Sequence, residues 1–194
     1  ALPEVPLEAR LRLLELAGRH GLFRAASFTS GELPTVRDGG RLEGIDLLAL
    51  NIDEARALAE LRDPALEATA VAERTASSVT GSHPRLQLSI TAGAQGSWSW
   101  DGQRLAHCPA LAVQAASTAG AGDAHLAGIL AGLACGLELS SAQLLGTLVA
   151  AAAVTSPHTI HDALSREQLA ELWARGGFEE GGTGRGVGEL IGAC

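Results

Sequence analysis

The segment Ser117–Asp123 (Ser-Thr-Ala-Gly-Ala-Gly-Asp) leads directly into a run of small and apolar residues that is typical of a buried helix. Gly120 and Gly122 stand on either side of Ala121 and allow a tight turn that brings successive backbone N–H groups close to a ligand. The helix start adds the positive end of its dipole, so the segment predicts an anion-binding turn. Asp123 is placed to take a proton from a hydroxyl beside the anion, which favours phosphoryl transfer.

The same segment also has a purely structural explanation. An acidic residue in the first turn of a helix is favourable on dipole grounds alone, and glycine-rich turns before helices are common. Its spacing excludes two better-known phosphate motifs. His125 stands where the dinucleotide-binding fingerprint needs its third glycine, and no Lys-Ser/Thr pair follows as in a P-loop. The segment is therefore either a plain helix start or an anion site of another kind.

Composition narrows the class of protein. The 194 residues are 46% hydrophobic, which is enough to bury a core. The formal net charge of −8 argues against nucleic acid or an anionic membrane as a partner, and the longest apolar run, Leu144–Val154, is too short to span a bilayer. Three cysteines without C-x-x-C spacing favour a reducing compartment, so a cytoplasmic location is expected. Because the sequence has no Met, we expect a processed chain or a fragment.

An alternation of helical and strand patterns in the first part of the chain predicts an α/β fold. Apolar residues at helical spacing predict a helix over Pro6–Arg19, and strand patterns follow at Leu22–Phe28 and Ile45–Leu50. The intervening stretch Thr29–Gly44 contains glycine and proline and is expected to be a surface connection. Helix, strand, connection and strand in this order are typical of a parallel sheet with helices on its faces.

A candidate helix start, Asn51-Ile-Asp-Glu54, follows the second of these strands. Asn51 as N-cap with Glu54 three residues later is close to a capping box, which alone could explain both residues. A capped helix start is also a rigid place for a carboxylate that faces a metal ion, so the two roles are compatible.

The middle of the chain predicts a strand, a glycine loop and a hairpin. The strand covers Arg85–Thr91, and the loop that follows contains Gly93 and Gly96. One interpretation of these glycines is a plain turn into the hairpin that Asp101-Gly102 indicates.

Further along, a short strand is expected at residues 111–113 and leads into the anion-binding turn. The turn would then lie at the carboxyl end of a strand, where open α/β sheets bind their ligands. Helices are predicted from residue 124 to Gly136, over 140–154 and over 165–175. The glycine-rich stretch 176–194 lacks apolar periodicity and predicts a mobile tail.

Three motifs occur in the order found in the PfkB/ribokinase family of sugar and nucleoside kinases. They are Asn51-x-x-Glu54, Thr91-x-Gly93-x-x-Gly96 and Thr118–Asp123, the last of which closely resembles the family's C-terminal signature Asp-Thr-Thr-Gly-Ala-Gly-Asp. The resemblance runs from about Leu7 to Leu172. It implies a ribokinase-like three-layer αβα sandwich with a mostly parallel sheet and its N-terminal part missing. Residues 1–175 would form the C-terminal part of the kinase domain, and residues 176–194 the tail.

The resemblance also implies catalytic roles for individual residues. Asp123 would be the base that deprotonates the acceptor hydroxyl. Four backbone amides, those of Gly120, Ala121, Gly122 and Asp123, would stabilise charge on the transferring phosphoryl group.

ATP and Mg²⁺ are the implied cofactors. The nucleotide-binding residues would be Thr91, Gly93, Gly96, Gly122 and Asn51. Glu54, together with Asn51, would organise Mg²⁺ and its water. Ser117 and Ala119 replace the Asp and the second Thr of the usual signature, and since that Asp commonly helps to bind an activating monovalent cation, a potassium site is in doubt.

The resulting hypothesis is an ATP-dependent kinase that transfers the γ-phosphoryl group to a hydroxyl of a sugar or nucleoside. The weakened signature and the stretch 148–165 resemble the pseudouridine-kinase branch most. The alternative is a catalytically inactive ribokinase-like module for binding or assembly; a dinucleotide-binding protein is disfavoured by the missing third glycine. A parallel sheet without its N-terminal strands would expose apolar surface, so we expect the chain to need its missing segment or a partner, such as a second copy in a homodimer.

Overall fold

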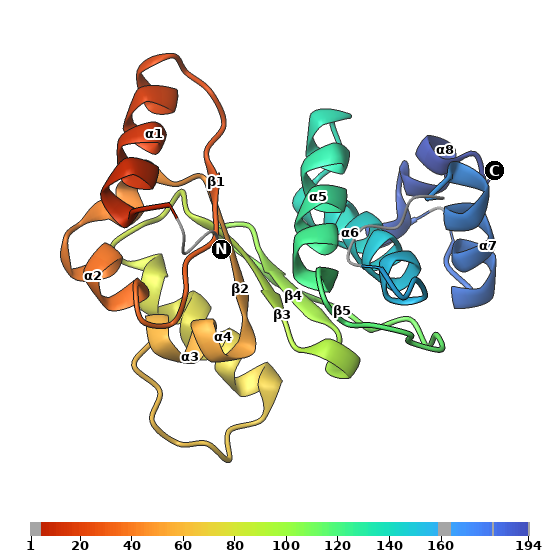
Figure 1. The fold of residues 1–194 in the computed structure, drawn as a ribbon, viewed down its shortest axis with the longest axis horizontal. Helices are drawn as coiled ribbons and strands as arrows, with labels where there is room; N and C mark the ends of the chain where they lie inside the picture. The colour runs from red at the N-terminus through yellow and green to blue at the C-terminus, as the bar shows by residue number, and fades with distance from the viewer. Residues whose placement is uncertain (1–4, 159–163, 180, 194) are drawn as a thin grey trace. The chain divides into compact units, whose positions relative to one another are not determined.

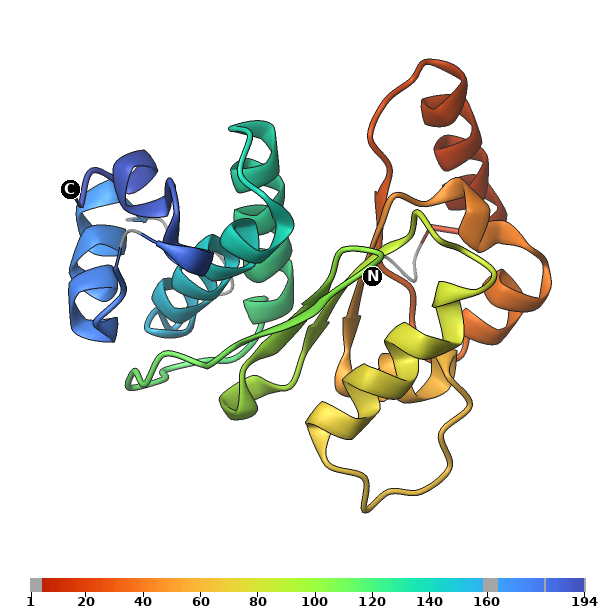
Figure 2. The same ribbon diagram turned by 180° about the vertical axis from the view of Figure 1, so that it is seen from behind.

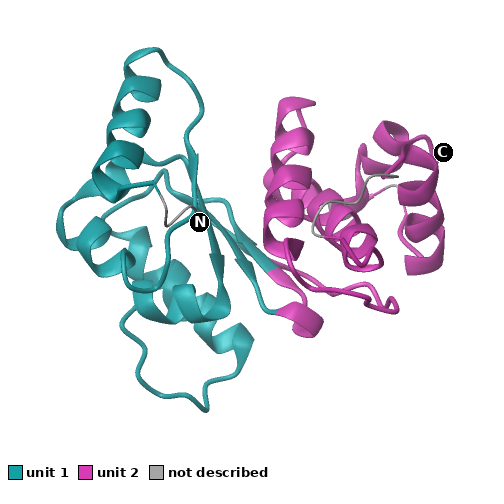
Figure 3. Ribbon diagram, viewed as in Figure 1, with its two compact units in different colours: residues 1–92, 98–105 teal, residues 93–97, 106–194 magenta. Residues whose placement is uncertain are grey.

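The computed structural model describes residues 5–158, 164–179 and 181–193. The chain divides into two compact units, coloured separately in Figure 3. Unit 1 comprises residues 1–92 and 98–105, and unit 2 comprises residues 93–97 and 106–194.

A five-stranded sheet with the strand order β1-β2-β3-β4-β5 confirms the predicted α/β class. The first three strands are parallel: β1 (Ala25–Ala26) pairs with β2 (Leu47–Asn51), which pairs with β3 (Gln87–Thr91). The hairpin predicted around Asp101-Gly102 joins β4 (Ser97–Trp100) to β5 (Leu105–Cys108). Strand β1 is much shorter than the strand expected over Leu22–Phe28.

The helices of unit 1 share one hydrophobic core with the strands. They are α1 (Leu7–Arg19), α2 (Leu33–Asp38), α3 (Ile52–Leu58) and α4 (Ala68–Thr80), with a 3₁₀ turn, η1, at Arg41–Gly44 (Figure 1). Side chains such as Leu48, Leu88 and Ile90 of the sheet are fully buried in this core. The apolar runs of β2 and β3 are explained by this burial.

The stretch Thr29–Gly44 is not the surface connection that the sequence predicted. It contains α2 and η1, and Leu33, Val36 and Leu42 are buried in the core of unit 1. These three apolar residues are too few and too close to glycines to give a clear helical period, so the packing that orders them is visible only in the structure.

Unit 2 is mainly helical. Its helices are α5 (Ala121–Ala134), α6 (Leu139–Val154), α7 (Arg166–Gly176) and α8 (Val187–Ile191), with 3₁₀ turns η2 (Gly93–Gln95) and η3 (Gly182–Gly184). Helices α5 and α6 lie side by side, as both views show (Figures 1 and 2). The predicted helix end at Gly136 is confirmed, since α5 stops at Ala134 and Gly136 adopts a φ of 85°.

The apolar run Leu144–Val154 forms most of α6 and is buried within unit 2. Leu144, Leu145 and Leu148 belong to its core. Among the described residues, no helix is both long enough and apolar enough to cross a membrane.

The glycine-rich stretch after α7, for which the sequence predicts a mobile tail, contains packed helical turns. Over its described part it forms η3 and α8, and Val187 and Ile191 of α8 are buried in the core of unit 2. Two apolar residues one helical turn apart are too short a pattern to reveal a helix without the surface on which they pack.

The short strand expected at residues 111–113 is also absent from the described structure. These residues form an irregular segment between β5 and α5. The segment is attached to the end of α6, because the N–H groups of Ala116 and Ser117 both donate to the Val154 carbonyl, at 2.7 and 3.2 Å. Its backbone is therefore held by a helix rather than by a sheet neighbour.

Candidate functional site

The turn before α5 has the geometry of a glycine-dependent helix start. Gly120 is the N-cap residue, with φ 79° and ψ −1°, a left-handed conformation that favours glycine. The Ala121 N–H donates to the Thr118 carbonyl at 3.2 Å, and the Ala124 N–H donates to the Gly120 carbonyl at 2.9 Å. No side chain caps this helix start within the described part of the chain.

Backbone donors remain available at this turn. The N–H groups of Gly122 and Asp123 have no acceptor among the described residues. A Cβ built on Gly122 would meet nothing within 4 Å, so the space beside the turn is open. Free N–H groups at the positive end of a 14-residue helix are a suitable site for an anion.

Asp123 lies in the first turn of α5 with an exposed side chain. No described residue forms a hydrogen bond or ion pair with its carboxylate. His125, two residues further, lies on the opposite, buried side of the helix and is 5% exposed. The carboxylate is thus accessible to a substrate, whereas the imidazole packs inside unit 2.

Asn51 and Glu54 form a complete capping box at the start of α3. The Asn51 Oδ1 accepts from the N–H groups of Asp53 and Glu54, both at 2.9 Å, and the Glu54 Oε2 accepts from the Asn51 N–H at 2.8 Å. Burial raises the pKa of the Glu54 carboxyl, partly opposed by the Asn51 N–H. The structural role expected from the sequence is therefore confirmed.

Thr91 lies directly beside Asn51, because these two residues are register partners at the carboxyl ends of β3 and β2. Its hydroxyl donates to the Leu50 carbonyl at 3.4 Å. The sheet thus brings Asn51, Glu54 and Thr91 to one edge of unit 1, the edge where parallel sheets bind ligands.

The loop Gly93–Gly96 belongs to unit 2. Gly93 has a φ of 56° and open space around it, whereas Gly96 has a φ of 91° and packs tightly. A Cβ on Gly96 would lie 2.4 Å from the Cys108 carbonyl oxygen. Packing by itself therefore explains why Gly96 is a glycine, while Gly93 leaves room for a ligand.

No group of three or more His, Cys, Asp or Glu residues within the described ranges could enclose a metal ion. Mg²⁺ keeps most of its waters and binds through substrate phosphates with one or two carboxylates. Glu54 fits that arrangement, because only one of its two carboxylate oxygens is bonded to the backbone.

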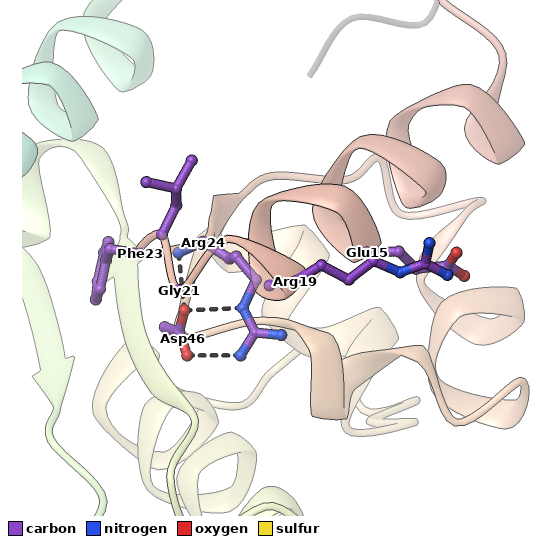
Figure 4. Close-up of a pocket in the computed structure, with 8 residues that line it drawn as sticks. Glu15, Arg19, Gly21, Phe23, Arg24 and Asp46 are labelled. Carbon is purple, nitrogen blue, oxygen red and sulfur yellow. Dashed lines mark hydrogen bonds and ion pairs between the residues drawn. The ribbon is translucent and has the colours of Figure 1, made fainter.

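A cavity of about 700 Å³ lies at the other end of the sheet, lined by Phe23, Arg24 and Asp46 among others (Figure 4). Arg24 and Asp46 precede β1 and β2, so the cavity is at the amino ends of the strands. Asp46 accepts from the Arg24 backbone N–H at 2.8 Å and from its guanidinium at 3.0 and 2.9 Å. The guanidinium is the main cause that lowers the pKa of Asp46. The sequence does not reveal this pair, because nothing in the local pattern links residues 22 positions apart.

Comparison with known proteins now decides the family. A family model described as the pfkB family of carbohydrate kinases matches residues 14–166. The chain belongs to the pfkB family of carbohydrate kinases. The matched range contains all three motifs on which the predicted resemblance was based, so that prediction is confirmed.

Individual relatives support the same assignment. The Escherichia coli (strain K12) protein named "Uncharacterized sugar kinase YegV" is 35% identical over 104 residues, which are 54% of this pfkB-family chain and 31% of the relative. Adenosine kinase from Sinorhizobium meliloti has a TM-score of 0.67 at 23% identity, covering 86% of this chain and 49% of that one. Phosphofructokinase-2 from Escherichia coli, in complex with potassium, has a TM-score of 0.69 at 21% identity, covering 90% and 54%.

These structural matches show that the fold is ribokinase-like, as the resemblance implied. The chain spans about half the length of the solved relatives, 49% and 54%, and 31% of the curated one.

Proposed function

We propose that this pfkB-family chain acts in an ATP-dependent kinase that transfers the γ-phosphoryl group to a hydroxyl of a sugar or nucleoside. One observation carries the proposal. The free N–H groups of Gly122 and Asp123 lie at the start of α5, next to an exposed and unpaired Asp123 carboxylate. An anion-binding turn and a base thus stand side by side in the chain.

The proposed reaction follows from this placement. The Asp123 carboxylate accepts the proton of the acceptor hydroxyl, the hydroxyl oxygen forms a bond to the γ-phosphorus, and the bond from that phosphorus to the bridging oxygen of ADP breaks. The proton remains on Asp123, and the electron pair leaves with ADP. Amides of Gly120, Gly122 and Asp123 would stabilise the charge on the phosphoryl oxygens, the electrostatic contribution that usually dominates such reactions. The Ala121 amide, which the sequence also assigned to this role, is not available because it donates to the Thr118 carbonyl.

The cofactor sites follow from the remaining motifs. Thr91, Gly93 and Gly96 would contact the phosphates of ATP. Mg²⁺, when bound, would neutralise phosphate charge. Glu54 would hold one of its waters through the carboxylate oxygen that the capping box leaves free.

For the acceptor, we propose a nucleoside of the pseudouridine type, on the resemblance of residues 148–165 to that branch. Residues 159–163 of this stretch lie outside the described ranges. The relatives reported above include a sugar kinase and an adenosine kinase, which supports a ribose or sugar hydroxyl in general. A comparison of pseudouridine, other ribosides and hexoses as acceptors, with ADP formation as the readout, would identify the class.

Two further proposals concern the setting of the enzyme. Free cysteines, one buried (Cys108) and one exposed (Cys135), suit a reducing compartment such as the cytoplasm. Large apolar side chains next to the edge strand β1 are exposed, Leu22 by 60% and Phe23 by 53%, so we expect a partner or a second copy to cover them. Light scattering of the purified chain would show whether it is monomeric.

The decisive test of the proposed function compares Asp123→Asn with Glu73→Gln, a control at an exposed carboxylate on α4. Asp123→Asn is expected to reduce phosphoryl transfer by at least about 1,000-fold and to leave MgATP binding nearly unchanged, whereas the control is expected to keep its activity. Undiminished turnover in Asp123→Asn would exclude this residue as the base and favour another mechanism.

A further inference from the structure

His107 of β5 holds the loop that the proposed function assigns to the phosphates of ATP. Its Nε2 lies 3.0 Å from the Gln95 carbonyl oxygen. Because a carbonyl oxygen can only accept, Nε2 is the donor and carries the hydrogen. The bond joins the middle of the loop Gly93–Gly96 to a strand outside it, within unit 2.

The loop Gly93–Gly96 contains an internal hydrogen bond and packs against the end of β5. The Gly96 N–H donates to the Gly93 carbonyl at 3.1 Å. A Cβ on Gly96 would come 2.9 Å from the His107 Nε2 and 3.0 Å from the Pro109 Cα. Residues 107–109 therefore form the surface on which the loop rests.

This surface is in turn attached to α6. The Cys108 Sγ lies 3.4 Å from the Thr147 Oγ1, which itself lies 3.1 Å from the Gln143 carbonyl and donates to it. The far end of α6 carries the Val154 carbonyl, which accepts from Ala116 and Ser117 just before the anion-binding turn. One helix thus anchors both segments that the proposed function places at phosphates.

We propose that His107 is a positioning residue for the triphosphate of ATP, an inference that rests on the proposed function. A carbonyl that accepts from His107 cannot at the same time face an anion. By bonding the Gln95 carbonyl, His107 keeps this negative end of a peptide dipole from turning toward the phosphates. Without the imidazole, the Gln95–Gly96 peptide loses one of its two hydrogen bonds and keeps only that from the Gly96 N–H to the Gly93 carbonyl. The Gln95 carbonyl is then less restrained, and the repulsion it exerts grows with the charge of the ligand.

The test measures the affinity of the purified chain for MgATP and for adenosine by calorimetry. In His107→Ala the affinity for MgATP is expected to fall by about 3- to 10-fold, the effect of one lost hydrogen bond, while the affinity for adenosine changes by less than about 2-fold. His107→Gln places an amide donor near the position of Nε2 and is expected to restore most of the loss. Gln103→Ala, at an exposed position of the same hairpin, serves as the control and is expected to bind both ligands as the unmodified chain does.

Two results would overturn the inference. One is an unchanged affinity of His107→Ala for MgATP. The other is an equal loss for MgATP and adenosine, in His107→Ala or in His107→Gln, because that pattern indicates general damage to the fold. Failure of the unmodified chain to bind MgATP would instead refute the proposed function, and the inference with it.

Discussion

Gly128 of α5 lies directly against Gly146 of α6: a Cβ added to Gly128 would come 2.7 Å from the Gly146 Cα. A Cβ on Gly146 would lie 2.7 Å from the His125 carbonyl oxygen and 2.9 Å from the Ile129 Cγ1. Because neither residue has a side chain, the two helix backbones can approach closely. This contact places the first two turns of α5, which carry the candidate base, against a helix that also anchors the preceding segment.

Replacing either glycine of this contact should destabilise unit 2. Gly146→Ala is expected to lower the free energy of unfolding by about 1–3 kcal/mol, because a backbone has to move to admit the methyl group. Thermal or urea unfolding followed by circular dichroism would measure it. Gly31→Ala is a matched control, since a Cβ there meets nothing within 4 Å, and it should change stability by less than about 0.5 kcal/mol. Equal stabilities of the two variants would show that the helices are not in close contact.

The buried imidazole of His125 should make the protein sensitive to mild acid. Burial lowers the pKa of His125 from an ordinary value of 6.5 to about 4. Between these two values the unfolded state binds the proton and the folded state does not, so stability falls as the pH decreases from about 6.5 to 4. The free energy of unfolding is expected to decrease by up to about 3 kcal/mol by pH 4.

Replacement of this histidine tests that pH dependence. His125→Phe is expected to lose part of the decrease in melting temperature between pH 7 and pH 5, because it removes the group that titrates only in the unfolded state. His20→Gln, at an exposed position after α1, serves as the control and should retain the full decrease. The same decrease in both variants would mean that the acid sensitivity comes from other groups.

The capping box allows the two roles of Glu54 to be separated. Glu54→Gln keeps a side-chain oxygen that can accept the Asn51 N–H, so stability should change by less than about 1 kcal/mol. If Glu54 also organises Mg²⁺, turnover should fall by about 10-fold or more, because the charge that orients the water is lost. Asn51→Ala, in contrast, removes the cap and should cost about 0.5–2 kcal/mol of stability. Normal turnover of Glu54→Gln at low Mg²⁺ concentration would leave only the structural role.

The pair formed by Arg24 and Asp46 should contribute to stability above the pH range where Asp46 is protonated. Because the guanidinium lowers the pKa of the Asp46 carboxyl, its contribution is present above the ordinary value of 3.8 and is lost as the pH falls through the lower, folded-state value. Asp46→Asn is expected to lower the free energy of unfolding by about 1–2 kcal/mol at pH 7. The effect is modest because the side chains of Arg24 and Asp46 are 22% and 33% exposed. Urea unfolding at pH 7 and pH 3 would measure this, and the difference from the unmodified chain should shrink at pH 3. A constant difference would contradict an ionic contribution.

Two local features that carry predicted site residues, the capping box and the glycine-dependent helix start, are present in the structure. The capping box spans residues 51–54, and the anion-binding turn spans residues 117–123, so both depend on contacts within a few positions of the chain. In contrast, the bond from His107 to the Gln95 carbonyl and the attachment of Ser117 to Val154 join residues 12 and 37 positions apart. Sequence spacing carries no signal for such contacts.

By itself, the sequence determined the α/β class and the position of each motif, because periodicity, capping and glycine turns act over one or two turns of the chain. The resemblance of the three motifs to a known family indicated the family. Where the apolar residues of a stretch are too few to form a clear pattern, only the tertiary structure decided which of them are buried. Leu33 and Val36 of α2 and Val187 and Ile191 of α8 lie in the two cores, although the stretches around them predicted a surface connection and a tail. The physical reason is that so short a helix gains most of its stability from the surface on which it packs, and that surface comes from distant parts of the chain.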